Sequence, residues 1–188
     1  MAVERVLYFE KAGEENTDEA LRIAKEYADK HGIRSIVVAS TRGKTAEKAL
    51  EYFGEGYNLV VVTHEAWFRP SVRQEFDEEI RRKLVSRGVK VVTAAHAFRG
   101  VDRAVRDKYG GPSPADLIAD VLRLFCQGVK VCVEIVLMAA DAGCIPLDED
   151  VIAIGGTGRG ADTVLLVKPS TSRRLFDLRI RKILAKPI

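Results

Sequence analysis

The chain has 188 residues, 47% of them hydrophobic, and this length suits one sizeable domain or two very small ones. Its 30 lysines and arginines nearly balance its 27 acidic residues, so the net charge of +3 is too small to imply an electrostatic partner by itself. The first residues lack the apolar core of a signal peptide, and no apolar run is long enough to span a bilayer. These features predict a cytoplasmic protein with no membrane partner.

The cysteine content argues against disulfide and metal sites, and the amide content indicates the habitat of the protein. Cys126, Cys132 and Cys144 are odd in number and lack a Cys-x-x-Cys spacing, so we expect neither a disulfide framework nor a metal site. Asparagine and glutamine together number four, beside 30% charged residues, a combination typical of heat-adapted proteins.

Short apolar runs alternate with helical patterns through the first half of the chain, which indicates βαβ units and a parallel sheet. Strands are predicted over Val3–Phe9, Ser35–Ala39, Leu59–Thr63 and Val89–Thr93. Helices are predicted over Asp18–His31, Thr45–Phe53 and Val72–Arg87, with Thr17 capping the first and Ser71 the last. Unbroken valine and isoleucine runs favour strands covered on both faces.

The second half begins with a predicted charged loop, His96–Gly111, followed by a capping box at Ser113 that predicts a helix over Pro114–Phe125. Val129–Ala142 is apolar nearly all round, which favours a buried helix, although its first half alternates like a strand. Further strands are predicted over Val151–Ile154, Thr163–Lys168 and Phe176–Ala185. The loop between the first two is too short for a helical crossover, so one of them should be antiparallel. We expect residues 1–188 to form a single three-layer α/β/α sandwich with a mostly parallel mixed sheet.

The sharpest local signal is a polar turn between a predicted strand and a predicted helix. It comprises Ser40, Thr41, Arg42, Gly43, Lys44 and Thr45. Free N–H groups at a helix start favour an anion, to which the hydroxyls add donors, the two cations add charge and the glycine adds room for close approach. The turn lacks the spacing of a Walker A loop. It predicts a phosphate site, with an ordinary capped turn as the alternative.

Four glycines lie close together between the strands predicted at 151–154 and 163–168. We expect this loop to contact a ligand through Gly156, Thr157, Gly158 and Arg159, because a plain hairpin needs only one or two glycines. The downstream helix of a dinucleotide fingerprint is absent from the pattern. A flexible hairpin loop is the alternative.

Two histidines and a threonine follow the third and fourth predicted strands. Thr63, His64 and His96 would therefore meet the polar turn at the carboxyl edge of the sheet, where ligands of open α/β sheets bind. Solvated loop residues are the alternative.

Charged residues interrupt the apolar helix predicted at 129–142. Lys130 and Glu134 share one face, and Asp141 continues it. They predict groups that line the ligand crevice, with an internal Lys130–Glu134 ion pair or a simply solvated face as the alternatives, and we favour the crevice.

The turn at 40–45 resembles the sugar-phosphate loop in the carboxy-terminal domain of pyruvate kinase. That loop follows the pattern T-x-[ST]-G-x-[ST]-A, of which Gly43, Thr45 and Ala46 match, while Thr41 falls one residue early and Arg42 replaces a hydroxyl residue. A family of stand-alone proteins with this domain is similar over essentially the whole chain, notably at 127–134, 138–143 and 155–162.

This resemblance implies a pyruvate kinase C-terminal domain-like fold and flavin mononucleotide (FMN) as cofactor. The turn would hold the ribityl phosphate, and the loops at His64, His96 and Thr157–Arg159 would face the ribityl chain or ring. Pyruvate kinase catalysis does not carry over, since its site lies in a barrel of roughly 250 residues. If the protein is an enzyme, the resemblance favours a flavin-dependent oxidoreductase, and no catalytic residue is identified.

Two other functions compete with flavin binding. A regulatory module that senses a sugar phosphate would use the same phosphorylated small-molecule site. A nucleic-acid binder would use the basic residues of 169–188, although apolar residues between them favour a half-buried strand. The predicted strand Phe176–Ala185 would also be an edge strand, which offers a pairing surface for a homo-oligomer.

Overall fold

A computed structural model describes residues 5–188 of the chain. It contains a seven-stranded sheet in the order β1-β7-β6-β5-β2-β3-β4. The strands are β1 (Leu7–Phe9), β2 (Ser35–Ala39), β3 (Asn58–Val62), β4 (Lys90–Val92), β5 (Val151–Gly155), β6 (Thr163–Lys168) and β7 (Arg179–Pro187). Every pairing is parallel except those of β6, which runs antiparallel to both β5 and β7. The predicted mostly parallel mixed sheet is confirmed.

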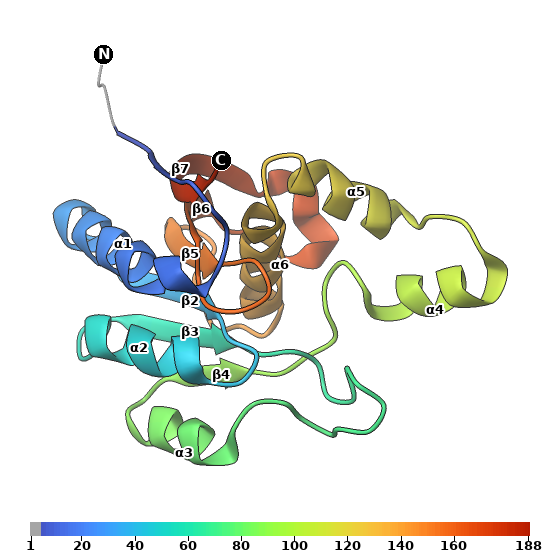
Figure 1. Ribbon diagram of the computed structural model, residues 1–188, viewed down its shortest axis with the longest axis horizontal. Coiled ribbons are helices and arrows are strands. Elements are labelled where there is room, and N and C mark those ends of the chain that lie inside the picture. The colour runs from blue at the N-terminus through green and yellow to red at the C-terminus, as the bar shows by residue number, and fades with distance from the viewer. Residues whose placement is uncertain (1–4) are drawn as a thin grey trace.

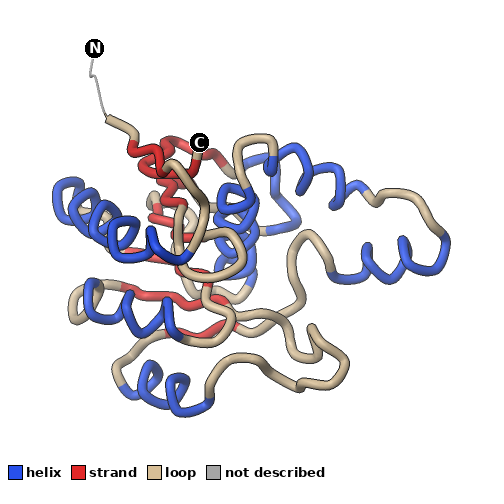
Figure 2. Tube along the Cα trace, viewed as in Figure 1, coloured by secondary structure: helices blue, strands red, loops and turns tan. Residues whose placement is uncertain are grey.

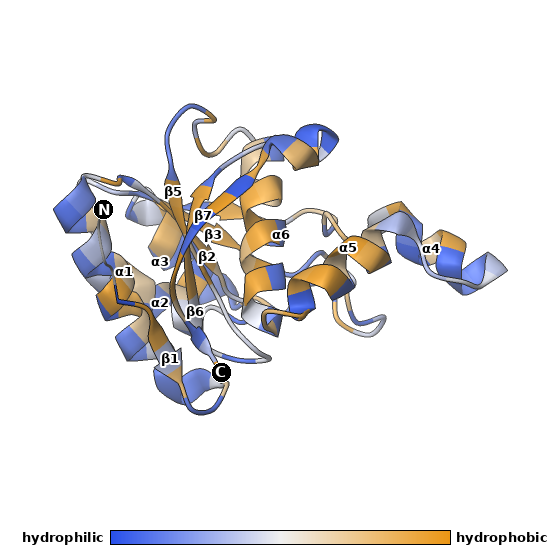
Figure 3. Ribbon diagram, turned by 90° about the horizontal axis from the view of Figure 1, so that it is seen from above, coloured by the Kyte–Doolittle hydropathy of each residue, from blue (hydrophilic) through white to orange (hydrophobic). Residues whose placement is uncertain are grey.

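Helices cover both faces of this sheet, as Figures 1 and 3 show. The helices are α1 (Thr17–His31), α2 (Lys44–Tyr52), α3 (Glu78–Ser86), α4 (Gly100–Tyr109), α5 (Pro114–Arg123) and α6 (Gln127–Asp141), with short 3₁₀ turns η1 (Glu14–Asn16) and η2 (Ser172–Asp177). The first three helices lie on one face, and α6 covers the other with α5 packed on its outside. Among residues 5–188, no helix combines the length and the apolar character needed to cross a bilayer.

Burial explains why the central strands read as unbroken apolar runs. Residues of β2, β3 and β5 are almost all buried, because alternate side chains pack against helices on opposite faces. One core lies against α1 and α2, and the other lies against α6. Twelve of the 15 residues of α6 are buried, so the predicted buried helix is confirmed. The hydropathy colouring of Figure 3 shows the same apolar helix beside apolar strands.

Several helix starts differ from the predictions. Thr17 is the first residue of α1 and not its cap; its hydroxyl donates to the Glu14 carbonyl oxygen. The helix predicted from Val72 begins only at Glu78, because Asp77 caps it by accepting from two backbone N–H groups. The capping box at Ser113 is confirmed.

Other predicted boundaries were also wrong. The predicted loop His96–Gly111 contains α4, a helix with no buried residue and an Arg103–Asp107 ion pair, so apolar periodicity could not reveal it. Residues 172–177 form η2, and the strand predicted at Phe176–Ala185 is β7, at Arg179–Pro187. In the strand predicted at Val3–Phe9, β1 occupies Leu7–Phe9, and residues 3 and 4 lie outside the described part.

The seventh strand is internal and not at the edge of the sheet. It pairs with β1 on one side and with β6 on the other. The expectation of an exposed edge at 176–185 is therefore wrong, because a short N-terminal strand covers it. The two edges of the sheet are β1 and β4, each three residues long.

Candidate functional site

A cleft of about 600 Å³ lies at the carboxyl ends of β2 and β3, beside α6. Figure 2 shows the loops that follow these strands gathered along this edge of the sheet. Twelve of the fifteen predicted ligand-binding residues line the cleft, namely Ser40, Thr41, Arg42, Lys44, Thr45, Thr63, His64, His96, Glu134, Gly156, Gly158 and Arg159. The other three, Gly43, Thr157 and Lys130, do not line it. Four separate loops and one helix therefore converge on one cavity.

The turn before α2 presents backbone donors at the helix start. Ser40 is buried, and its hydroxyl accepts from the backbone N–H of Ala46 at 3.3 Å, which caps one of the free groups. The N–H groups of Gly43, Lys44 and Thr45 have no acceptor among residues 5–188. With the helix dipole they form an anion-binding arrangement.

Gly43 is required for packing between helices, whereas the sequence suggested the close approach of a ligand. Its φ is 103°, and a Cβ placed there would lie 2.8 Å from the Ile80 side chain on α3. The glycine thus allows α2 and α3 to pack closely.

The glycine loop after β5 is likewise shaped by the chain itself. A Cβ on Gly156 would lie 2.7 Å from the Gly160 carbonyl oxygen, and one on Gly160 would lie 2.5 Å from the Glu14 Cα. Only Gly158 faces open space. Asp162 is fully buried and accepts from the Thr157 N–H at 3.1 Å, which holds the loop in place. Gly156 and Gly160 therefore reflect close packing of the loop on itself and on η1 and the start of α1, whereas Gly158 does not.

The two predicted histidines lie next to each other across the cleft, with ring centroids 5.4 Å apart. The Nδ1 of His64 contacts the Glu75 carboxylate at 2.9 Å, and its Nε2 contacts the Thr41 hydroxyl at 3.3 Å. The Nε2 of His96 accepts from the backbone N–H of Glu65 at 3.3 Å. Burial lowers the pKa of His96, although the Glu134 carboxylate opposes this. Neutral imidazole is therefore the favoured form of His96.

Lys130 and Glu134 form a buried ion pair, with Nζ and Oε2 2.5 Å apart. Glu134 also accepts from the Phe98 backbone N–H at 3.3 Å. Burial lowers the pKa of Lys130, with the Glu134 carboxylate acting in the opposite direction. Glu134 is thus both paired with Lys130 and part of the lining of the cleft. Asp141 does not continue this stripe into the site, because it is exposed and accepts from the Ser172 N–H.

The structure adds cleft residues that the sequence did not indicate. Arg69 and Glu75 come from the long loop after β3, and they pair at 3.2 Å. Glu14 comes from η1, and Thr17 is the first residue of α1. Four apolar side chains form a wall, namely Val62, Val131, Ile135 and Met138. A local motif marks none of these positions, because only the fold brings them to the same edge.

Several cations that line the cleft have no carboxylate partner. Lys48 pairs with Asp18 at 2.8 Å. Arg42, Lys44 and Arg159 also line the cleft, and within the described part of the chain no carboxylate lies in ion-pair range of them. Three such cations beside free N–H groups suit a ligand with an anionic end.

Comparison with known proteins supports a relationship to pyruvate kinase. The family described as pyruvate kinase, alpha/beta domain, matches residues 18–167. Two solved structures of a pyruvate kinase from Cryptosporidium parvum, one of them titled as a complex with ADP, match at 16% and 17% identity, each with a TM-score of 0.40. Each match covers 80% of this chain and 22% of the pyruvate kinase, so this chain spans less than a quarter of that enzyme. Because the family match includes most of its residues, the chain belongs to the pyruvate kinase alpha/beta domain family.

Proposed function

We propose that the cleft binds a phosphorylated small molecule, and that this molecule is FMN. The observation that carries the proposal is the convergence of free N–H groups at the start of α2 with Arg42, Lys44 and Arg159 around one cavity. A phosphate is the group that such donors and cations accommodate best.

The shape of the cleft favours a flavin over a bare phosphate. Its volume of about 600 Å³ lies within the range of sites for cofactors and drug-sized ligands. The apolar wall of Val62, Val131, Ile135 and Met138 offers a surface for a flat ring, while Thr63, His64 and His96 offer polar partners for a ribityl chain. If the protein is an enzyme, the redox chemistry would come from the flavin itself.

A direct experiment identifies the ligand. The purified protein is denatured by heat, and the released small molecules are identified by mass spectrometry. We expect FMN, together with flavin absorption of the folded protein and its loss after treatment with a chaotrope that removes the cofactor. A colourless protein that neither releases nor binds FMN would contradict the proposal.

A sugar-phosphate sensor is the second candidate, and the position of the 40–45 turn in a pyruvate kinase-type domain favours it. It predicts a colourless protein whose melting temperature rises with a sugar phosphate and not with FMN. Nucleic-acid binding has less support, because Arg174 pairs with Asp177 and Arg181 pairs with Asp150.

Substitution of a cation in the cleft distinguishes the binding of these small ligands from nucleic-acid binding. We expect Lys44→Gln to weaken FMN or sugar-phosphate binding about tenfold, which is the usual cost of one charged hydrogen bond. Nucleic-acid binding through the C-terminal segment would not respond to this change.

A further inference from the structure

A second cavity, of about 450 Å³, lies between α6 and the helices α4 and α5. We call it the arginine groove, because Arg99, Arg103, Arg106 and Arg123 line it together with Lys130. It adjoins the cleft, and His64, His96, Gln127, Val131 and Glu134 line both cavities.

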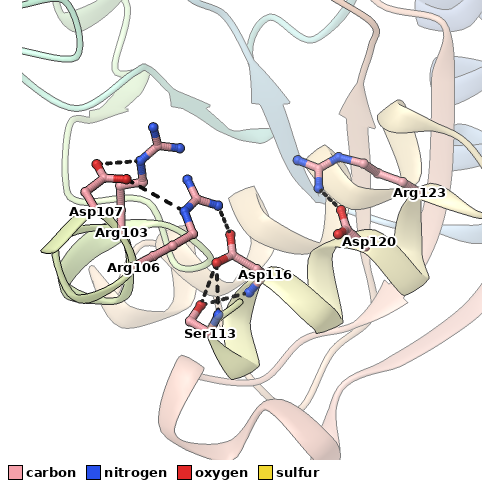
Figure 4. A network of polar contacts seen from close by, with 7 residues as sticks. All are labelled: Arg103, Arg106, Asp107, Ser113, Asp116, Asp120 and Arg123. Carbon is pink, nitrogen blue, oxygen red and sulfur yellow. Dashed lines mark hydrogen bonds and ion pairs between the residues drawn. The ribbon is translucent and has the colours of Figure 1, made fainter. Parts of the chain in front are cut away.

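The groove is built from three helices and carries surplus positive charge. Five cations line it, together with the three carboxylates of Asp116, Asp120 and Glu134. Asp107 is a fourth carboxylate, which pairs with Arg103 and Arg106, so a surplus of one positive charge remains. Figure 4 shows the side chains of Arg103, Arg106 and Arg123 around the space between α4 and α5.

Four of these cations have carboxylate partners, and one has none. Asp107 contacts Arg103 at 2.9 Å and Arg106 at 3.8 Å, as Figure 4 shows. Arg106 contacts Asp116, and Arg123 contacts Asp120, each at 2.6 Å. Arg99 lies over the Phe68 ring, 4.5 Å from its centroid, and no carboxylate of residues 5–188 lies within ion-pair range of it.

The cations also repel one another. Burial is the main cause that lowers the pKa of Lys130, and the charges of Arg123 and Arg99 add to it. Gathering like charges around a partly enclosed cavity costs free energy, which an anion between them would recover. Guanidinium groups also suit oxyanions, because their planar N–H pairs match two oxygens at once.

We infer that the arginine groove is a second ligand site, which binds an oxyanion of two or more negative charges, such as a phosphate ester or a dicarboxylate. The anion lies beside the ligand of the cleft, at the wall formed by His96 and Glu134. It is either the far end of that ligand or a second molecule. The inference does not require the cleft ligand to be FMN.

Pyrophosphate is the probe for this site, and calorimetric titration measures its affinity. Arg99→Gln and Arg123→Gln each remove one charge from the groove. Arg106 is kept, because it pairs with the aspartate of the Ser113 capping box. We expect each change to weaken pyrophosphate binding about tenfold. Arg82→Gln, on the exposed side of α3, is the matched control and should leave the affinity unchanged.

A further variant, Lys44→Gln, distinguishes the two cavities. Pyrophosphate affinity that depends on Lys44 and is indifferent to Arg99 and Arg123 would overturn the inference while leaving a phosphate site at α2. Absence of measurable pyrophosphate binding would overturn it as well, as would equal losses in the groove variants and in the Arg82 control.

Titration of the FMN-saturated protein then identifies the source of the anion. Pyrophosphate that still binds with the same dependence on Arg99 supports a second molecule. If FMN instead prevents pyrophosphate from binding, and this competition between FMN and pyrophosphate is lost in the Arg99→Gln variant, one ligand reaches from the cleft into the groove. If FMN does not bind at all, the proposed function fails, and the titrations of the ligand-free protein still decide whether the groove binds an anion.

Discussion

Lys130 and Glu134 show how one pair of side chains can serve both the core and the site. The two residues are 8% and 4% exposed, and their contact of 2.5 Å compensates for part of the cost of burying two charges. Glu134 also fixes the backbone at Phe98. The ion pair is therefore a structural element of the wall between the cleft and the arginine groove.

Replacing Glu134 with Gln tests that role. The variant keeps the shape of the side chain but leaves Lys130 as a buried cation without its counter-ion, so we expect the free energy of unfolding to fall by about 3 kcal/mol. Chemical denaturation measures the loss. The double variant Lys130→Met/Glu134→Leu should recover much of it, since apolar side chains of similar volume replace both charges. A Glu134→Gln variant as stable as the original protein would show that the pair is well solvated.

His96 predicts a pH dependence with a definite sign. Its pKa in the folded protein lies below the ordinary value of 6.5, so the unfolded chain binds the proton more readily. Stability is therefore lost as pH falls below 6.5 toward the lowered pKa, with a slope of at most about 1.4 kcal/mol per pH unit. Denaturation of the His96→Gln variant should show a shallower decline over the same window.

At the scale of elements, the glycine loop after β5 is a rigid connection between the sheet and the start of α1. Asp162 accepts from the N–H groups of Gly13 and Thr157 at 3.1 Å each, and the Ala161 N–H donates to Thr17 at 3.0 Å. These contacts place the loop at the rim of the cleft before any ligand arrives.

Two glycines of this loop share a left-handed backbone but differ in their surroundings. Gly158 has a φ of 77°, and a Cβ placed there would meet open space, whereas Gly160 has a φ of 69° and close contact with Glu14 and Thr17. We expect Gly158→Ala to cost about 1 kcal/mol of stability from backbone strain alone. Gly160→Ala should cost about 3 kcal/mol, because overpacking is added to the strain. Equal losses, measured by denaturation, would show that packing against α1 is not what requires a glycine there.

At the scale of the whole molecule, the C-terminal segment is part of the sheet. Strand β7 lies between β1 and β6, and its residues Leu184 and Ala185 are buried in the core. The basic residues of this segment therefore belong to an internal strand and its neighbouring turn, not to a separate arm.

Removing residues 179–188 tests that placement. The truncated chain loses two strand pairings and leaves β1 without a neighbour, so we expect no cooperative thermal transition. Circular dichroism during heating measures this. Removal of Ile188 alone, which is 85% exposed, is the control and should keep a cooperative transition. A truncated protein that melts like the original would show that the strand is dispensable.

The class of fold and most of the central elements could be predicted from the amino-acid sequence. Unbroken apolar runs predicted β2, β3, β5 and β6, because strands buried on both faces leave no polar alternation. Hydroxyls and cations after β2 marked the turn at 40–45, since helix starts carry a local chemical signature.

The roles of individual polar and glycine residues could not be predicted, because they depend on contacts between distant segments. Helix α4 has no buried residue, and Gly43 and Gly160 are required by side chains distant in sequence. Glu75 and Arg69 reach the cleft because a long loop folds back over His64. The arginine groove likewise depends on the way α4 and α5 pack beside α6. Local patterns report burial and helix starts, whereas contacts between distant segments depend on the packing of the complete chain.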